Sequence, residues 1–279
     1  MISHNNQKKI AVINDISGFG RCSIAVSMPV ISYMGIQCCP VPTSIFSNHT
    51  GFENFFFDDY TEKMQPYIDN WKKLDLHFSG IMVGFLGSKR QIDIVHRFVD
   101  DFKDENTTVI IDPAMGENGK PYPTYTPQMC EEMKRLVRYA DIITPNVTEC
   151  CILTDTPYKE DGWRREELFE MAQKLLDTGA RKVAVSGVRM GRYVGNVIAQ
   201  QGREPRLIKT EKTGAYRSGT GDLYAAIIAS DSVNGVDFEV SVRKAADFVK
   251  RALVETDRLE IPPTDGLAFE EVLYTLKRR

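Results

Sequence analysis

Short apolar segments alternate with amphipathic segments along most of the chain. The apolar segments are about five residues long and rich in Val and Ile, as buried parallel strands are, and they comprise residues 9–13, 36–41, 80–84, 108–111, 141–144 and 182–186. The segments between them repeat apolar residues with a helical period and comprise residues 24–34, 89–103, 126–139 and 164–178. This order predicts an α/β fold, a three-layer sandwich in which a mostly parallel central sheet has helices on both faces.

The pattern changes after residue 187. Segments 193–200 and 205–211 alternate like antiparallel strands, and the helical segments 222–231, 238–256 and 269–277 follow. No long linker divides the chain, so we predict one domain over residues 1–279. Right-handed crossovers bring the carboxyl ends of parallel strands to one edge of the sheet, where ligands bind. Functional residues are therefore expected at those strand ends.

Composition excludes some classes of protein. The chain has 279 residues and a net charge of −3, which provides no basic face for nucleic acid, and we interpret the basic end 277–279 as a solvated helix end. No apolar run reaches the roughly eighteen residues of a membrane-spanning helix, and the first residues contain no signal-peptide core. The six cysteines fit neither a zinc site nor a secreted disulfide framework. These features predict a cytoplasmic protein without membrane or nucleic-acid partners.

A glycine-rich segment, Ser218-Gly219-Thr220-Gly221-Asp222, directly precedes a good helix-forming sequence. Glycines at a helix start let several backbone N–H groups face one point, and the helix dipole adds to the attraction for an anion. A carboxylate at this place, Asp222, can accept a proton from an attacking hydroxyl group. The motif taken alone is equally compatible with a capped helix start.

Two further segments place acids at strand ends. Asp112 ends one predicted strand, with Glu117 five residues later, and Thr144 ends another, with Asn146 and Glu149 behind it. Carboxylates at such ends commonly bind magnesium or its waters. A local turn at Asp112 and a capping box formed by Asn146 and Glu149 are the structural alternatives.

Two further segments are predicted to be loops. Residues 46–52 carry four polar side chains, Ser47 to Thr50, between two phenylalanines, which suits the binding of a polar aromatic ring better than a generic turn. Residues 14–21 follow the first strand but lack the G-x-G-x-x-G spacing of dinucleotide-binding proteins, and the chain contains no P-loop motif.

In this order the segments resemble the ribokinase superfamily and, within it, the pyridoxal (pyridoxine, pyridoxamine) kinases. The resemblance runs from about residue 9 to about residue 256, and four blocks carry it: 46–51, 112–116, 144–149 and 219–223. It implies ATP-dependent phosphorylation of the 5′-hydroxyl group of B6 vitamers, a magnesium ion, a monovalent cation such as K⁺, and a homodimer.

The resemblance also implies a role for each matching residue. Asp222 would be the general base, and the backbone of Gly219, Thr220 and Gly221 would hold the transferred phosphoryl group. Asp112, Glu117, Thr144 and Glu149 would surround the magnesium ion and the phosphates. The nucleotide would contact Asn146, Glu149, Ser186, Thr213, Gly219 and Gly221. The acceptor pocket would be lined by Asp15, Ser47, His49, Thr50 and Phe85, with Tyr125 in a flap over it.

Three alternatives remain open from the sequence. Residues 15–18, Asp-Ile-Ser-Gly, are more similar to the hydroxymethylpyrimidine kinases of thiamin synthesis. A catalytically silent B6-binding or nucleotide-binding protein would share the fold, although the intact acids disfavour it. A sugar kinase is weaker, because Phe46, Phe52 and Phe85 favour stacking on a flat ring.

Overall fold

One mostly parallel sheet organises the protein, which we describe from a computed structural model covering residues 3–215 and 217–276. Within these residues the sheet has nine strands in the order β11-β10-β9-β8-β5-β4-β1-β2-β3. The strands are β1 (Lys9–Phe19), β2 (Gln37–Asn48), β3 (Phe57–Asp59), β4 (Gly80–Val83), β5 (Thr108–Ile111), β8 (Ile142–Ile143), β9 (Lys182–Met190), β10 (Tyr193–Gln200) and β11 (Arg203–Glu211), while β6 (Gly116–Glu117) and β7 (Lys120–Pro121) form a separate hairpin. From β9 to β2 in this order, each strand is parallel to its neighbours. Strands β10, β11 and β3 pair antiparallel with their neighbours.

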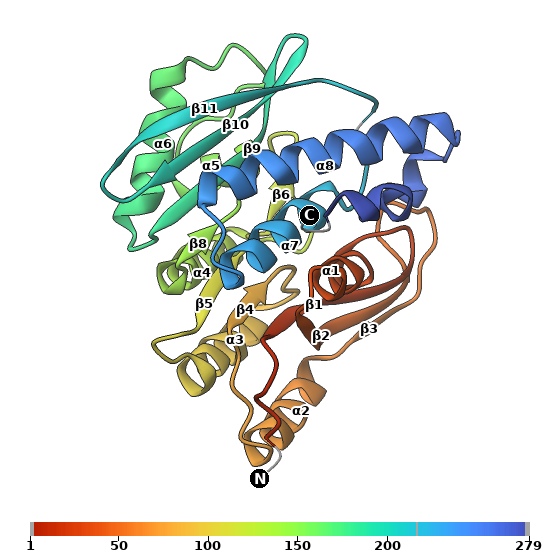
Figure 1. The fold of residues 1–279 in the computed structure, drawn as a ribbon, viewed down its shortest axis with the longest axis vertical. Helices are drawn as coiled ribbons and strands as arrows, with labels where there is room; N and C mark the ends of the chain where they lie inside the picture. Colours follow the sequence, from red (N-terminus) through yellow and green to blue (C-terminus); the bar gives the residue numbers. More distant parts are fainter. Residues whose placement is uncertain (1–2, 216, 277–279) are drawn as a thin grey trace.

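Helices cover both faces of the sheet, which confirms the predicted α/β sandwich (Figure 1). One face packs against α2 (Thr61–Lys73), α3 (Lys89–Phe102), α4 (Pro127–Leu136), α5 (Val147–Leu153) and α6 (Arg165–Asp177). The other packs against α1 (Ser23–Tyr33), α7 (Thr220–Val233), α8 (Phe238–Arg258) and the 3-10 helix η3 (Phe269–Leu276). In β4, Ile81 and Val83 face the first layer and Met82 faces the second. The strands are apolar at successive positions because both of their faces are buried.

The structure corrects several predicted boundaries. Both segments predicted as loops begin as strand, because β1 continues to Phe19 and pairs with the continuation of β2 to Asn48, so that residues 14–19 and 46–48 are extended. Helix α2 and strand β3 were not predicted, and the last helix is 3-10 rather than α. The predicted helix end at 277–279 lies outside the described residues. No helix in the described part of the chain combines the length and apolar character needed to span a membrane.

The strand order reverses between β1 and β4. From β1 the chain adds β2 on one side, whereas β4, β5, β8 and β9 follow one another on the other side. In open parallel sheets the crevice for ligands lies at the carboxyl ends of the strands beside such a switch point.

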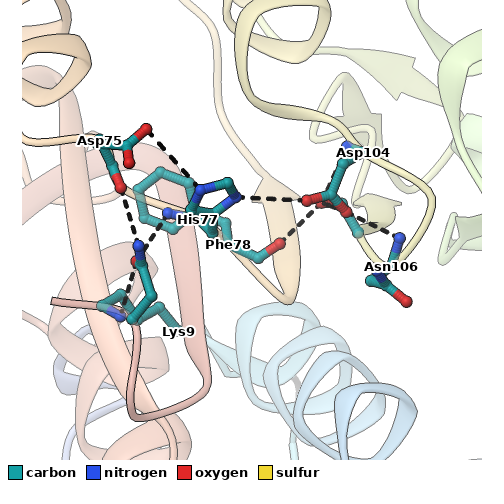
Figure 2. A network of polar contacts seen from close by, with 8 residues as sticks. Lys9, Asp75, His77, Phe78, Asp104 and Asn106 are labelled. Atoms are coloured by element: carbon teal, nitrogen blue, oxygen red, sulfur yellow. Dashed lines mark hydrogen bonds and ion pairs between the residues drawn. The ribbon is translucent and has the colours of Figure 1, made fainter. Parts of the chain in front are cut away.

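The amino ends of the same strands carry a separate polar network. His77 lies between Asp75 and Asp104 (Figure 2). Its ring nitrogens are 3.9 and 3.6 Å from the carboxylate oxygens of these two residues. The Asn5 side chain donates to the Asp75 carbonyl group and accepts from the His77 N–H. This network joins the residues before β1 to the segments before β4 and β5, at the edge opposite the switch point.

Candidate active site

Four neighbouring strands place residues in one row at the carboxyl edge. Asn14 lies in β1, and Gly84, Asp112 and Thr144 directly follow β4, β5 and β8. The residues two positions earlier pack on the side of α1, α7 and α8; they are Val12, Met82, Ile110 and Ile142. Because side chains alternate along a strand, the row faces α7. Thr144 Oγ1 donates a hydrogen bond of 3.0 Å to Asp112 Oδ1.

The amino end of α7 lies opposite this row. Gly219 caps the helix with a φ of 84°, and α7 begins at Thr220. A Cβ atom on Gly219 would lie 2.2 Å from the carbonyl oxygen of Arg21, so the position needs glycine for both its backbone angle and its space. The first N–H groups of the helix have no partner within the helix and are available to an anion.

Asp222 stands in the first turn of α7 and faces the cavity. Asn14 Nδ2 donates to its Oδ1 atom at 3.2 Å, and the backbone N–H of Ser23 donates to the same carboxylate. Burial raises the pKa of Asp222, while these donors act against the rise. The carboxylate is therefore held by hydrogen-bond donors from β1 and from the start of α1.

Two other acids lie close enough to interact with this centre. Burial, with a contribution from the charge of Asp222, raises the pKa of Asp112 to about 7. Burial and the charge of Asp112 raise the pKa of Glu149, against hydrogen bonds from the N–H groups of Asn146 and Met115. Neighbouring carboxyl groups raise one another's pKa when both are charged, and a cation between them stabilises the charged forms. The carboxyl groups of Asp112 and Glu149 therefore fit a hard metal ion. Residues 3–215 and 217–276 contain no group of three or more His, Cys, Asp or Glu arranged to hold a metal by themselves.

The capping-box alternative at Asn146 is also realised. Asn146 Oδ1 accepts from the Glu149 N–H at 3.0 Å, and Glu149 Oε2 accepts from the Asn146 N–H at 2.8 Å. The same side chains line the cavity. Capping α5 and facing the cavity are thus compatible.

Asp15 occupies the other side of the centre. Its two carboxylate oxygens accept from Ser23 Oγ at 2.6 Å and from Ser17 Oγ at 3.0 Å. Burial raises the pKa of Asp15 to about 6, opposed by the Ser23 hydrogen bond and supported by the charge of Asp222. Nearby, His49 Nε2 lies 2.7 Å from the carbonyl oxygen of Thr264, in the short helix η2 (Pro263–Asp265).

A cavity of about 1300 Å³ connects these groups. It brings together all but two of the residues predicted for the site: Asp15, His49, Thr50, Phe85, Asp112, Glu117, Thr144, Asn146, Glu149, Ser186, Thr213, Gly219, Thr220, Gly221 and Asp222. Ser47 and Tyr125 are not among the lining residues. The exposed Ser47 hydroxyl group bonds to Asn48 and to the Phe56 N–H instead. Tyr125 is buried in the core, and Tyr122 lines the cavity in its place.

The sequence did not point to several other lining residues. Asn14 follows the apolar run of β1 and carries no motif signal apart from its neighbour Asp15. The hydroxyl groups of Ser44 and Tyr224 are buried at the cavity and have no hydrogen-bond partner among the described residues. Buried polar groups are normally paired, so these two hydroxyls are candidates for ligand contacts.

The fold and the site define a class. A mostly parallel sheet whose carboxyl edge presents acids to a glycine-led helix start is the arrangement of a ribokinase-like small-molecule kinase. The family model for phosphomethylpyrimidine kinase matches residues 28–264, and the chain belongs to this kinase family. Membership implies ATP as the phosphoryl donor.

The known relatives include both pyridoxal kinases and hydroxymethylpyrimidine/phosphomethylpyrimidine kinases. A putative phosphomethylpyrimidine kinase from Bacteroides thetaiotaomicron is 36% identical, with 100% of this chain and 97% of that chain covered at a TM-score of 0.96. A second structure of it, with pyridoxal, has a TM-score of 0.93 and covers 97% of this chain and 96% of that chain. The pyridoxal kinase of Arabidopsis thaliana is 26% identical over 85% of this chain and 79% of its own length. The hydroxymethylpyrimidine/phosphomethylpyrimidine kinase of Haemophilus influenzae is 24% identical over 89% of this chain and 92% of its own length.

Proposed function

We propose that the protein transfers the γ-phosphoryl group of ATP to the 5′-hydroxyl group of B6 vitamers, giving the 5′-phosphates and ADP. The observation that carries the proposal is the position of Asp222 in one cavity with both the open N–H groups of α7 and the pocket around His49. The 36% identical relative whose structure contains pyridoxal supports the choice of acceptor.

Each part of the site has a defined task in this reaction. Asp222 accepts the proton of the attacking hydroxyl group, and the N–H groups from Gly219 to Asp222 hold the charge of the transferred group. Asp112, Glu117, Thr144 and Glu149 would hold Mg²⁺, which supplies charge neutralisation at the phosphates, with a monovalent cation expected nearby. Asn146, Ser186 and Thr213 bind the nucleotide, and Asp15, His49, Thr50 and Phe85 bind the acceptor ring.

The second candidate is a hydroxymethylpyrimidine kinase. Asp15, with its buried carboxyl group between two serines, favours it, as do the pyrimidine-kinase relatives. Coupled assays of ADP release with pyridoxal, pyridoxine, pyridoxamine and hydroxymethylpyrimidine distinguish the two. A higher kcat/KM for the pyrimidine than for every B6 vitamer overturns the B6 proposal.

The catalytic assignment is tested by Asp222→Asn. We expect kcat to fall by at least about 1,000-fold, because the carboxylate is the proton acceptor, while the affinity for ADP changes less than about threefold. Turnover close to wild type in this variant excludes Asp222 as the base. A catalytically silent binding protein would instead bind pyridoxal without releasing ADP in the wild type.

We also propose that the chain works as one kinase domain and as a homodimer. Exposed apolar side chains in β3, in the residues before it and in the neighbouring strand β2 support the dimer; they are Ile45, Phe55, Phe56 and Phe57 and are called the aromatic edge below. A second copy is the proposed occupant, because Phe55 and Phe57 also line the cavity, so that a subunit seated there would close this side of the acceptor pocket. The cytoplasmic location stays a prediction from the sequence.

A further inference from the structure

We propose that Asn14 is a positioning residue of the catalytic centre: its amide group orients the Asp222 carboxylate, and Gly84 provides the space for that amide group. The inference rests on the proposed role of Asp222 as the base. Asn14 touches neither substrate in this proposal and acts through Asp222 alone.

The orientation of the Asn14 amide group follows from its surroundings. Its Oδ1 atom accepts two backbone hydrogen bonds, from Phe85 N at 2.8 Å and from Asp15 N at 3.0 Å. Backbone N–H groups can only donate, so the oxygen end of the amide must face them. The NH₂ end is thereby directed at Asp222 Oδ1, 3.2 Å away. A flipped amide would place its NH₂ group against two backbone N–H donors and its oxygen atom against the Asp222 carboxylate, which also only accepts.

Gly84 is required for space. An ideal Cβ atom at this position would lie 2.5 Å from Asn14 Nδ2 and 2.6 Å from its Cγ atom. The backbone of Gly84 is not in the left-handed region, so its φ angle would accept another residue. Its N–H continues the pairing of β4 with β1 by donating to Ile13 at 2.9 Å. Any side chain on Gly84 must therefore displace the Asn14 amide group or separate the two strands.

The consequence for the reaction is geometric. A neutral amide donor holds one oxygen of Asp222 without adding a positive charge. Such a charge would lower the basicity of the carboxylate and repel a nearby cation. The Ser23 N–H donates to the same carboxylate from the opposite element, α1. With both donors in place the base has one rotamer relative to the N–H groups of α7, and a displacement of about 1 Å costs on the order of 100-fold in rate.

The sharpest variant is Asn14→Asp. It has nearly the same shape, and one carboxylate oxygen can still accept from Phe85 and Asp15, but the other oxygen repels Asp222 instead of donating to it. We expect kcat to fall by about 100-fold or more while KM for ATP changes less than about threefold. Asn5→Asp is the matched control, because the Asn5 amide also bridges backbone groups, at the amino edge far from the cavity, and its kcat should stay within about twofold of wild type.

Gly84→Ala tests the same contact from its other side. Alone it should reproduce the loss in kcat, whereas in an Asn14→Ala background it should cost less than about twofold more, because the displaced group is already absent. The exchange Asn14→Asp with Asp222→Asn restores an amide–carboxylate pair with its partners reversed. It should recover the melting temperature lost in Asn14→Asp and should not recover turnover, which separates positioning of the base from support of the fold.

Three results overturn the inference. They are an Asn14→Asp enzyme with kcat within about threefold of wild type, a fully additive loss in the Gly84 and Asn14 double variant, and recovery of turnover by the exchange. If Asp222→Asn is inactive while Asn14→Asp is active, only this inference fails. If Asp222→Asn is active, the proposed function of Asp222 fails and the inference fails with it. Melting curves and ADP binding verify the fold of each variant, and Gly84→Ala decides the case if Asn14→Asp does not fold.

Discussion

Asp15 is a carboxylic acid that is only 5% exposed, held between the hydroxyl groups of Ser17 and Ser23. Its pKa is raised from 3.8 to about 6, so the folded protein retains a proton that the unfolded chain releases between these values. The contribution of Asp15 to the free energy of unfolding is therefore fully present below pH 3.8 and is lost as the pH rises through about 6. At about 1.4 kcal/mol per pKa unit, the loss approaches about 3 kcal/mol.

Asp15→Asn removes this charge and keeps groups that can bond both serines. The difference in free energy of unfolding between this variant and wild type should be about 2 kcal/mol more favourable to the variant at pH 8 than at pH 4.5. Urea titrations at the two pH values measure this double difference. Asp177→Asn, at an exposed position at the end of α6, is the matched control for the same comparison and should show no such change. An equal difference for Asp15→Asn at both pH values contradicts the prediction.

Ser44 presents a buried hydroxyl group to the cavity without a hydrogen-bond partner among the described residues. If the acceptor supplies the missing partner, Ser44→Ala should raise KM for the acceptor about five- to tenfold, the value of one neutral hydrogen bond. The free protein should become slightly more stable, by up to about 1 kcal/mol, because an unpaired buried group is removed.

Ser241 is the matched control for this change. Its hydroxyl group is also buried and unpaired among the described residues, but it lies in α8 and does not line the cavity. Ser241→Ala should also raise the melting temperature but should leave KM for the acceptor unchanged. Equal KM values for Ser44→Ala and wild type, with every vitamer and with the pyrimidine, exclude Ser44 as an acceptor contact.

At the scale of elements, the amino end of α7 depends on Gly219. Gly219 and Gly202, in the turn between β10 and β11, both have positive φ angles, 84° and 72°. A Cβ atom would meet nothing within 4 Å at Gly202 but would lie 2.2 Å from the Arg21 carbonyl oxygen at Gly219. Gly202→Ala should thus cost only the backbone term, about 1 kcal/mol of unfolding free energy, with kcat unchanged.

Gly219→Ala should cost at least about 2 kcal/mol more, because α7 or the segment before α1 must move. Since that movement displaces the N–H groups at the helix start, kcat should fall by at least about 100-fold. Chemical denaturation and the coupled assay measure both effects. Equal costs for the two glycine variants would show that the contact with Arg21 is not required.

The elements also show what the sequence could predict. Strands that are apolar on both faces were identifiable because each carries a continuous run of apolar residues. The second half of β1, residues 14–19, has polar side chains at Asn14, Asp15 and Ser17 instead of an apolar run, and it is a strand only because it pairs with the end of β2. Asp112 was visible at a strand end, and Glu149 was visible in the helix start that follows the strand end at Thr144. Asn14 was not, because its partners Phe85 and Asp222 lie 71 and 208 residues away.

At the scale of the whole molecule, the two ends of the sheet differ. The β3 end carries the aromatic edge, in which Phe56 is 65% exposed, and the strand has a free edge of backbone groups. The opposite end is β11, beside the start of α8, where Val240 is 54% exposed. Contiguous exposed aromatic groups mark protein contacts more strongly than a single aliphatic residue does.

We therefore expect light scattering after gel filtration to give twice the mass of one chain for the wild type. Phe56→Ser should weaken the dimer by at least about tenfold, since interface aromatic residues commonly contribute more than 1 kcal/mol each, whereas Val240→Ser should leave it intact. If the second subunit closes the cavity beside Phe55 and Phe57, the monomeric variant should also show a higher KM for the acceptor at unchanged ADP affinity. A wild type that stays monomeric at every concentration, or a Phe56→Ser dimer of unchanged strength, would place the subunit contact elsewhere or exclude it. The KM of the dissociated variant then decides whether one chain completes the acceptor pocket or two are needed.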